Sequence, residues 1–449
     1  MEAMEPIILI RDPEIIKNIT VKDFDHFLNH KEFFHEDTEP LFGGSLIQMK
    51  GERWRDMRTT LSPAFTGSKM RLMIPFMFEA CKNILDDLKD KVGKEEDIDI
   101  EDLIRRYTND VIASAGFGLQ VNSAKERDNE FFVMGRNLFQ FNVWQRILFF
   151  FSTQFRFLFK IFNIKIFPQK TMNFFRNIVR TTVDYRNNNN VSRPDMIQLL
   201  MEASKGTLKN TDPEDGHSVG FATTQEALKP KSVSREWTED ELISQVFIFF
   251  VAGFETSAGA LTVTIHELAL NPSIEERLYQ ECKEFKDSGK TLMIENVSQL
   301  KYLDCVINEA MRKWAVAIIM DRTCVKPYEL PPPREGGKPV LLQPGDVVYN
   351  LVNSIHMDEK YFPNPEVYDP DRFSDENKHN IKPFTFMPFG MGPRNCIGSR
   401  FALLELKVFL YNLIVNYKIL KGKKTLDPIE LNPSDFNIKV KGGTYVKLQ

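Results

Sequence analysis

Cysteine is scarce in this chain, and its cysteines are spaced too widely for a disulfide framework or a zinc site. The 449 residues include five cysteines, an odd number, and none of them belongs to a CxxC pair. Disulfide scaffolds and zinc sites depend on paired or closely spaced cysteines. The sequence therefore argues against both and favours a reducing compartment. Cys81, Cys282 and Cys305 lie in amphipathic stretches typical of buried, unreactive thiols.

The sequence also lacks an apolar run of roughly 20 residues, the length that a membrane-spanning helix requires. The chain starts with only four consecutive apolar residues, 7–10, before Arg11. This start resembles neither a signal peptide nor a membrane anchor. A net charge of -4 removes the usual global signature of a nucleic-acid-binding protein, so we expect no nucleic acid partner.

Phenylalanine is abundant where the other aromatic residues are few. The chain has 37 Phe, against 11 Tyr and 4 Trp. This excess predicts large apolar surfaces and a site for apolar ligands. Hydrophobic residues make up 42% and charged residues 27% of the chain, as in ordinary globular proteins. At about 150 residues per domain, the length alone would suggest about three domains.

Periodicity and turn signals predict a mainly α protein with smaller β-sheets, an α+β fold. A strand is expected at 6–10 and a β-rich region at 318–353, while residues 358–395 read as irregular. A capping box at Thr238 to Glu241 marks the start of a long helix that ends near Asn271. The polar segment 204–236 is predicted to be a flexible surface loop. Further helices are expected at about 51–62, 70–91, 100–122, 273–287, 303–314 and 397–417.

A Phe-rich stretch at 131–167 allows two interpretations. Basic residues, among them Arg146, Arg156 and Lys160, are interspersed with the aromatic ones. The stretch can form core helices with basic flanks. It can equally form an aromatic and basic surface that lies on a membrane interface, with cations near the headgroups.

The strongest chemical signal is a cysteine in a loop rich in glycine, with the pattern F-x-x-G-x-R-x-C-x-G. It runs from Phe389 to Gly398, with Arg394 and Cys396 inside it. Glycines let backbone N–H groups approach a sulfur atom. The helix that follows points its positive end at the sulfur, which favours the thiolate. The pattern predicts a thiolate that ligates a metal, with Arg394 placed to meet an anionic group nearby.

Four weaker patterns accompany this loop. Glu309 and Arg312 are three residues apart on a predicted helix face and can form an ion pair. Arg372 follows in a Pro-Asp-Arg-Phe motif and could join that pair. Trp54 and Arg58, one helical turn apart, could hold a second anionic group. The segment 252–256, Ala-Gly-Phe-Glu-Thr, places poor helix formers inside the long helix, which suggests a widened helix beside a ligand.

In this order and spacing, the five patterns resemble the signature set of the cytochrome P450 haem-thiolate monooxygenases. In detail the chain resembles the microsomal type, and an insect family that metabolises foreign compounds. The resemblance covers residues from about 5 to the C-terminus, and it is carried by the cysteine motif and by GERWRDMRTTLSPAFTGSKM, RDPEIIKNITVKDFDHF and RKW…DRTCVKPYELP. It implies a P450 fold in one haem domain, residues 1–449, with haem between the long central helix and the cysteine loop.

The resemblance also assigns roles to individual residues. It makes Cys396 the axial thiolate ligand of the haem iron, and it gives Glu255 and Thr256 a role in oxygen activation. Glu309, Arg312 and Arg372 are expected to form a structural triad behind the haem. We expect six further residues to bind the cofactor: Trp54, Arg58, Arg322, Phe389, Arg394 and Gly398. Among them, Trp54 and the three arginines are expected to face the haem propionates.

The implied reaction inserts one oxygen atom of O₂ into a lipophilic organic molecule, a xenobiotic or an endogenous lipid or terpenoid. The cofactor is haem b, and NADPH supplies electrons through a flavoprotein reductase that docks near Cys396. Cytochrome b5 is a further expected partner. Two alternatives remain open: a haem-thiolate isomerase or dehydratase, and an inactive truncated haem protein.

Members of this family attach to the cytosolic face of the endoplasmic reticulum. Microsomal relatives carry an N-terminal anchor and a Pro-rich hinge, and this chain starts after both, so we expect a truncated chain that is loosely attached to the membrane or cytosolic. Peripheral membrane contact would then come from the Phe-rich stretch. A second departure is Ala315-Val316, where the family usually has Pro soon after the ExxR-x-W run.

Overall fold

The computed structural model describes residues 6–94, 97–208, 219–224, 228, 237–332, 334–432 and 438–449. Most of the loop predicted at 204–236 lies outside these residues, so its flexibility stays a prediction. Helices dominate the described part of the chain, and short strands form three small sheets. The predicted class, mainly α with smaller β-sheets, is confirmed.

The helices lie close to the predicted ranges. Their bounds are α1 Pro13–Lys17, α2 Pro40–Gly43, α3 Gly51–Leu61, α4 Gly67–Lys91, α5 Ile100–Phe117, α6 Glu130–Phe139, α7 Val143–Gln154, α8 Arg156–Ile161, α9 Gln169–Asn189, α10 Met196–Ser204, α11 Glu239–Leu270, α12 Pro272–Asp287, α13 Lys301–Lys313, α14 Val352–His356 and α15 Ser399–Ile414. Within the range 100–122 the sequence predicts that the helix ends at the Gly116–Gly118 turn, and it does: Gly118 adopts a left-handed conformation with φ 73° and closes α5.

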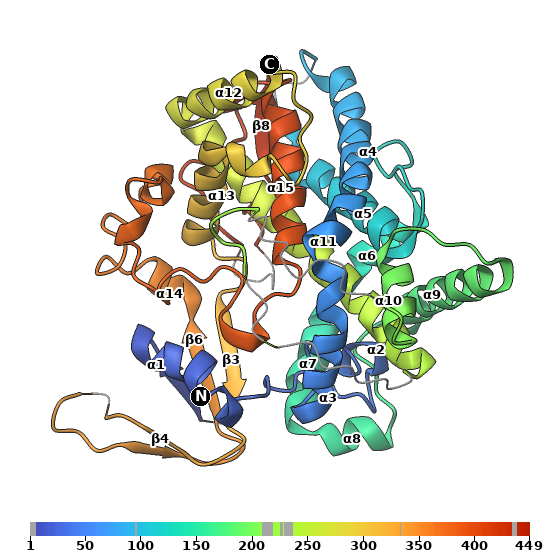
Figure 1. Ribbon diagram of the computed structural model, residues 1–449, viewed down its shortest axis with the longest axis vertical. Coiled ribbons are helices and arrows are strands. Elements are labelled where there is room, and N and C mark those ends of the chain that lie inside the picture. Colours follow the sequence, from blue (N-terminus) through green and yellow to red (C-terminus); the bar gives the residue numbers. More distant parts are fainter. Residues whose placement is uncertain are drawn as a thin grey trace.

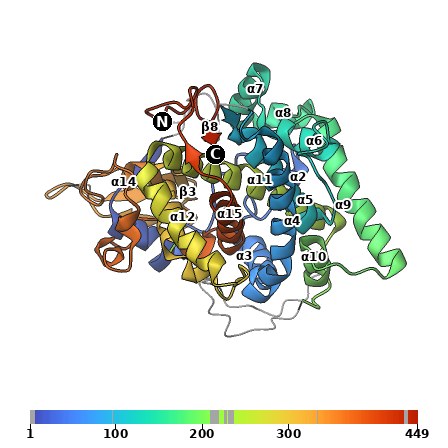
Figure 2. The ribbon, with the colours of Figure 1, turned by 90° about the horizontal axis from the view of Figure 1, so that it is seen from above.

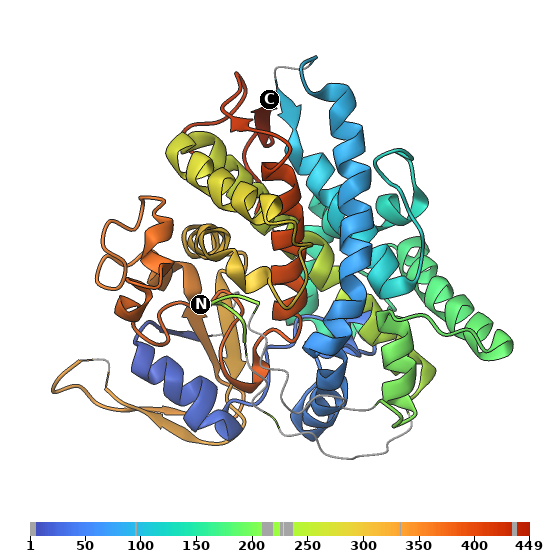
Figure 3. The same ribbon diagram turned by 45° about the horizontal axis from the view of Figure 1, so that its top comes forward.

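The strands gather mainly in the second half of the chain. They are β1 Ile7–Ile10, β2 Ile98–Asp99, β3 Ile319–Thr323, β4 Tyr328–Leu330, β5 Val340–Leu342, β6 Val347–Leu351, β7 Ile419–Leu420 and β8 Tyr445–Leu448. One sheet has the order β1-β6-β3, with β1 parallel and β3 antiparallel to β6. A second has the order β2-β8-β7, and β4 pairs with β5. In Figure 3 the first sheet, α1 and α14 lie on one side of the molecule and most of the long helices on the other.

Helix α11 runs through the middle of the molecule (Figures 1 and 2). It starts at the predicted capping box: the Thr238 hydroxyl accepts from the Glu241 N–H, and the Glu241 carboxylate accepts from the Thr238 N–H. Among the described residues, α11 is the one helix long and apolar enough to cross a membrane, and 72% of its most apolar window is buried in the fold. That burial is typical of the core helix of a globular domain.

The expected widening of the long helix at 252–256 is wrong, because α11 is a continuous α-helix over Glu239–Leu270. Gly253 serves close helix packing instead. A Cβ atom at this position would lie 2.6 Å from Cδ1 of Ile112 on α5. The glycine therefore lets α5 and α11 approach each other closely, and this contact places the middle of α11 beside the side chains of α5.

Candidate active site

Cys396 lies between a short 3-10 turn, Gly392–Arg394, and the first residue of α15. The other four cysteines are buried, whereas Cys396 is exposed. Its N–H donates to the carbonyl of Phe389 at 2.8 Å, which closes the loop. Many protein atoms nevertheless surround the thiol, and this loss of water raises its pKa, while the Gly398 N–H and the charge of Arg58 act in the opposite direction. The loop thus holds an exposed cysteine residue whose backbone is fixed by a hydrogen bond.

The glycines of this loop allow a close contact with the N-terminal part of the chain. Gly392 has φ 73°, and a Cβ atom on it would lie 1.8 Å from the backbone oxygen of Thr20. Thr20 belongs to a π-helical turn, Asn18–Lys22. No side chain fits in that space, so the motif's glycine is required both by its conformation and by this contact.

Two arginines tie the cysteine loop to distant segments through backbone and side-chain oxygens. Arg58 of α3 donates to the carbonyl of Asn395 and to its side-chain Oδ1, each at 2.7 Å. Arg394 donates to three backbone carbonyls, those of Leu28, Leu46 and Met49. Its guanidinium carbon lies 3.9 Å from the centre of the Trp54 ring, a cation–π contact.

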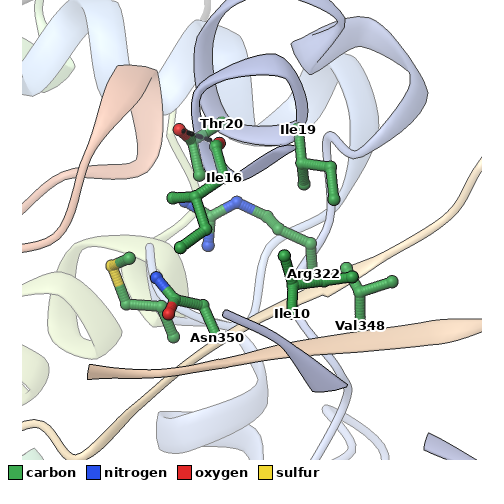
Figure 4. A pocket seen from close by; sticks show the side chains of 8 residues that line it. Ile10, Ile16, Ile19, Thr20, Arg322, Val348 and Asn350 are labelled. Atoms are coloured by element: carbon green, nitrogen blue, oxygen red, sulfur yellow. Dashed lines mark hydrogen bonds between the residues drawn. The ribbon is translucent and has the colours of Figure 1, made fainter. Parts of the chain in front are cut away.

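Arg322 of β3 lines a small cavity next to the first sheet (Figure 4). Its Nε has no hydrogen-bond partner among the described residues, and neither has Oδ1 of Asn350, which lines the same cavity. The cavity, of about 10 Å³, is large enough for about one water molecule. On its other side Arg322 borders a wider pocket of about 170 Å³, lined also by Arg394, Ile319 and Met320.

The guanidinium groups of Arg58, Arg322 and Arg394 repel one another, and the region around them holds little negative charge. Burial lowers the pKa of Arg394, and the charges of Arg322 and Arg58 lower it further. Burial also lowers the pKa of Arg322 to about 10. Asp321 is the nearby carboxylate, and it is shared with His30, at 2.9 Å, and the N–H of Lys31. Buried cations need anionic partners, so the site fits a ligand that brings carboxylates of its own, as haem does.

The structure brings together the three residues of the expected triad. Arg312 donates twice to the Glu309 carboxylate, each time at 2.7 Å, and both side chains are fully buried. Nε of Arg372 lies 3.4 Å from Glu309 Oε1. Arg312 also donates to the carbonyls of His356 and Pro365. The triad therefore joins α13 to the irregular segment that precedes the cysteine loop.

His356 packs directly behind this triad. Its Nε2 accepts from the Met387 N–H at 3.0 Å, so its Nδ1, 3.2 Å from the Arg312 carbonyl, carries the proton. Burial, and then the charge of Arg312, lower its pKa to about 3. These contacts make His356 a buried, neutral link between α14 and the segment that leads into the cysteine loop.

Glu255 and Thr256 lie in the middle of α11, and their side chains have different surroundings. Glu255 is buried and pairs with Arg105 of α5, with Nε and Oε1 3.2 Å apart. Arg105 also contacts Glu101, and although burial acts against it, the charges of Glu255 and Glu101 raise the pKa of Arg105. Thr256 is exposed, as is Ala252, whose carbonyl accepts from the Thr256 hydroxyl.

Phe65 links the cysteine loop to α11. An atom of its ring lies 3.9 Å from the position that a Cβ of Gly398 would occupy. The same ring lies 5.1 Å, centre to centre, from Phe249 of α11. The end of the cysteine loop and the first half of α11 thus contact the same aromatic ring.

Several residues of the site were not predicted from the sequence. Asn395 lies inside the cysteine motif, and the motif gave no sign of its bonds to Arg58. Arg105 follows Glu101 by four residues, a spacing that suggests only a local helix pair. Its bond to Glu255, 150 residues away, could not be expected without the packing of α5 on α11.

An accessible thiolate ligand with buried cations beside it is the arrangement that a haem-thiolate protein needs. The whole chain supports that class, because residues 2–445 match the family described as Cytochrome P450. The chain belongs to the cytochrome P450 family.

Individual relatives agree with this. Probable cytochrome P450 9f2 of Drosophila melanogaster is 44% identical over 458 residues, which cover 100% of this chain and 85% of that protein. Cytochrome P450 9e2 of Blattella germanica is 42% identical, with 100% and 84% covered. Cytochrome P450 6k1 of Blattella germanica is 35% identical, with 98% and 83% covered.

The protein is therefore a haem-thiolate monooxygenase with haem b as its cofactor. Enzymes of this family bind hydrophobic substrates and receive electrons from NADPH through a reductase. Neither an isomerase nor an inactive haem protein is favoured by these relatives.

Replacing Gly392 by alanine tests the contact between the cysteine loop and the N-terminal segment. We expect Gly392→Ala to lower the free energy of unfolding by about 3 kcal/mol or more, because a Cβ atom would collide with a backbone oxygen. Gly289→Ala is the matched control: Gly289 has φ 71°, and a Cβ there would meet nothing within 4 Å. The control should lose only about 1 kcal/mol. Urea unfolding measures both, and equal losses would contradict the proposed contact.

The pH dependence of stability tests the buried neutral His356. Its pKa is about 3 in the folded protein, against the ordinary histidine value of 6.5 in the unfolded chain. Between these values the unfolded chain binds a proton that the folded chain does not, so stability falls as the pH drops below 6.5. The expected slope is about 1 kcal/mol per pH unit from this group.

His356→Gln can keep one donor and one acceptor but does not titrate. Urea unfolding midpoints of wild type and His356→Gln should therefore converge as the pH is lowered from 7 to 5. If the two proteins lose stability in parallel, His356 does not carry this pH dependence.

Proposed function

We propose that this cytochrome P450 oxidises lipophilic organic molecules, either xenobiotics or endogenous lipids and terpenoids, at a site built on Cys396. The observation that carries the proposal is that Cys396 is the exposed cysteine of the chain and lies in a closed loop at the start of α15. Haem, when bound, supplies the activation of O₂. The protein's own residues hold the cofactor, deliver protons and exclude water.

In this proposal Cys396 is the axial ligand, and Phe389 and Gly398 keep its loop in place. The Phe389 carbonyl accepts from the Cys396 N–H, and the Gly398 N–H stabilises the thiolate. We assign the haem propionates to the arginine cluster. Arg322 and Arg394 line the open pocket, and Arg58 and Trp54 complete the cluster beside them.

Glu255 and Thr256 are proposed to move protons. The Thr256 hydroxyl is accessible and can exchange its bond to the Ala252 carbonyl for a bound water. The Glu255 carboxylate is held by Arg105. Turning away from Arg105 would let Glu255 take a proton from solvent and pass it toward Thr256.

The proposed role of Glu309, Arg312 and Arg372 is structural. Their buried ion pairs hold α13 against the segment that leads to the cysteine loop. We also propose that residues 1–449 form a single domain. Its support is a large hydrophobic core that includes residues from Phe24 to Leu448, with a smaller core beside the first sheet.

The Phe-rich helices α7 and α8 are proposed to contact the endoplasmic reticulum membrane from its cytosolic side. Their apolar side chains are unusually exposed: Trp144 73%, Phe157 66% and Ile161 63%. Arg156 and Lys160 on the same helices can approach anionic headgroups, although both pair with Asp37 here. We further propose that the reductase, and cytochrome b5 as an additional donor, dock on the side of the cysteine loop.

A carbon-monoxide difference spectrum tests the ligand assignment. The reduced, haem-loaded protein should show the red-shifted band of thiolate ligation, because a thiolate donates electron density to iron. Cys396→Ala should lose the band, whereas Cys324→Ala, which changes a buried cysteine, should keep it. A band typical of histidine ligation in the wild type would overturn the assignment. Product formation that needs NADPH and reductase would distinguish this enzyme from a peroxide-dependent isomerase.

Vesicle flotation tests the membrane contact. We expect the double variant Trp144→Ser and Phe157→Ser to bind vesicles of phosphatidylcholine and phosphatidylserine about tenfold more weakly than the wild type, because it loses two exposed aromatic side chains that would enter the membrane interface. Val367→Ser, at an apolar side chain that is 55% exposed elsewhere on the surface, is the control and should bind as the wild type does. Equal binding by all three proteins would rule out α7 and α8 as the contact.

A further inference from the structure

Residues 219–224 form a short segment that crosses from α13 to the start of α15, next to the cysteine loop (Figures 1 and 3). It lies far from both helices in sequence and belongs to neither. We call residues 219–224 the strap. An ion pair between α13 and α15 holds its first end, and hydroxyl hydrogen bonds to the cysteine loop and α15 hold its second end.

The first end of the strap is held by a buried ion pair. Lys407 of α15 is fully buried, and its Nζ donates to the Val219 carbonyl at 2.6 Å. The same Nζ lies 2.7 Å from Oδ1 of Asp304 on α13. The other oxygen of Asp304 accepts from the Phe221 N–H at 2.8 Å. Because a buried charge without its partner is costly, these contacts define one position for the strap.

Close packing also holds the middle of the strap. A Cβ atom on Gly220 would lie 2.0 Å from Asp304 Oδ1, so the backbone approaches the carboxylate more closely than a side chain would permit. The Phe221 ring lies 5.6 Å from Phe373 and 5.9 Å from Phe386. Both of these rings belong to the segment that leads into the cysteine loop.

The second end of the strap reaches the peptide of Cys396 itself. The Thr224 hydroxyl donates to the Cys396 carbonyl at 3.1 Å and lies 2.7 Å from the Ser399 hydroxyl. The Thr224 N–H donates to the same Ser399 oxygen at 3.3 Å. Each hydroxyl has one proton, so the Thr224 proton goes to Cys396 and the Ser399 proton goes to Thr224. The three bonds thus form a consistent network.

We propose that the strap fixes the peptide of the cysteine ligand, with Thr224 as a positioning residue for Cys396. This rests on the proposed role of Cys396 as the axial ligand. The direction of the Cys396 side chain depends on the orientation of its peptide. The Thr224 hydroxyl proton also places a positive dipole end on the carbonyl of the ligand's peptide, which favours the additional negative charge of the reduced state.

The test uses the haem-loaded full-length chain and the isosteric variant Thr224→Val, which loses the hydroxyl. Removal of one hydrogen bond should shift the equilibrium from thiolate-ligated to thiolate-free protein about fivefold. We expect a correspondingly larger share of reduced carbon-monoxide complex without the red-shifted band. The midpoint potential of the haem should move to more negative values. Thr224→Ser keeps the hydroxyl and should restore both properties.

Thr207→Val is the matched control. The Thr207 hydroxyl donates to the Glu202 carbonyl at the end of α10, outside the strap. This variant should leave the band and the potential unchanged. If Thr224→Val melts at a lower temperature but keeps the wild-type band and potential, the role is merely structural and the proposal is overturned. If the wild type itself lacks the red-shifted band, the assignment of Cys396 fails, and the proposal fails with it.

Discussion

The structure depends on a cluster of buried arginines around one cysteine loop. Arg394 donates from each of its three guanidinium nitrogens to a backbone carbonyl of the segment from Leu28 to Met49. Arg58 binds the loop at Asn395. These bonds hold the N-terminal part, α3 and the cysteine loop in one arrangement. The mutual repulsion of the cations makes the arrangement incomplete without an anionic ligand, which explains how the same residues can serve both folding and cofactor binding.

The second constraint is the central helix α11, which must be buried for the fold and accessible for the reaction. Most of its length packs against other elements, and Gly253 lets α5 approach it closely. Thr256 and Ala252 nevertheless remain exposed, while Glu255, one residue away, is buried and paired with Arg105. One turn of helix therefore exposes a hydroxyl and keeps the neighbouring carboxylate in an ion pair.

Local patterns predicted the fold class and the element bounds well, and they failed where packing decided the outcome. The capping box at Thr238 started α11 where expected, because capping is a matter of a few adjacent residues. The poor helix formers at 252–256 suggested a widened helix, but α11 stays regular there. Helix packing against Ile112, which the local sequence does not reveal, compensates for the glycine. The motif residues around Cys396, Glu309 and Glu255 were found from spacing and resemblance, but their partners were not.

The sequence by itself determined the class of this protein, because its cysteine motif and the accompanying Glu–Arg and Glu–Thr pairs lie in short segments whose spacing can be read directly. The tertiary structure alone decided which distant residues complete that chemistry. Arg105 meets Glu255, Thr20 meets Gly392 and Thr224 meets Cys396 across separations of 150, 372 and 172 residues. Such contacts carry no periodic signal, because they arise only when helices and loops pack into one core and bury groups that must then find partners.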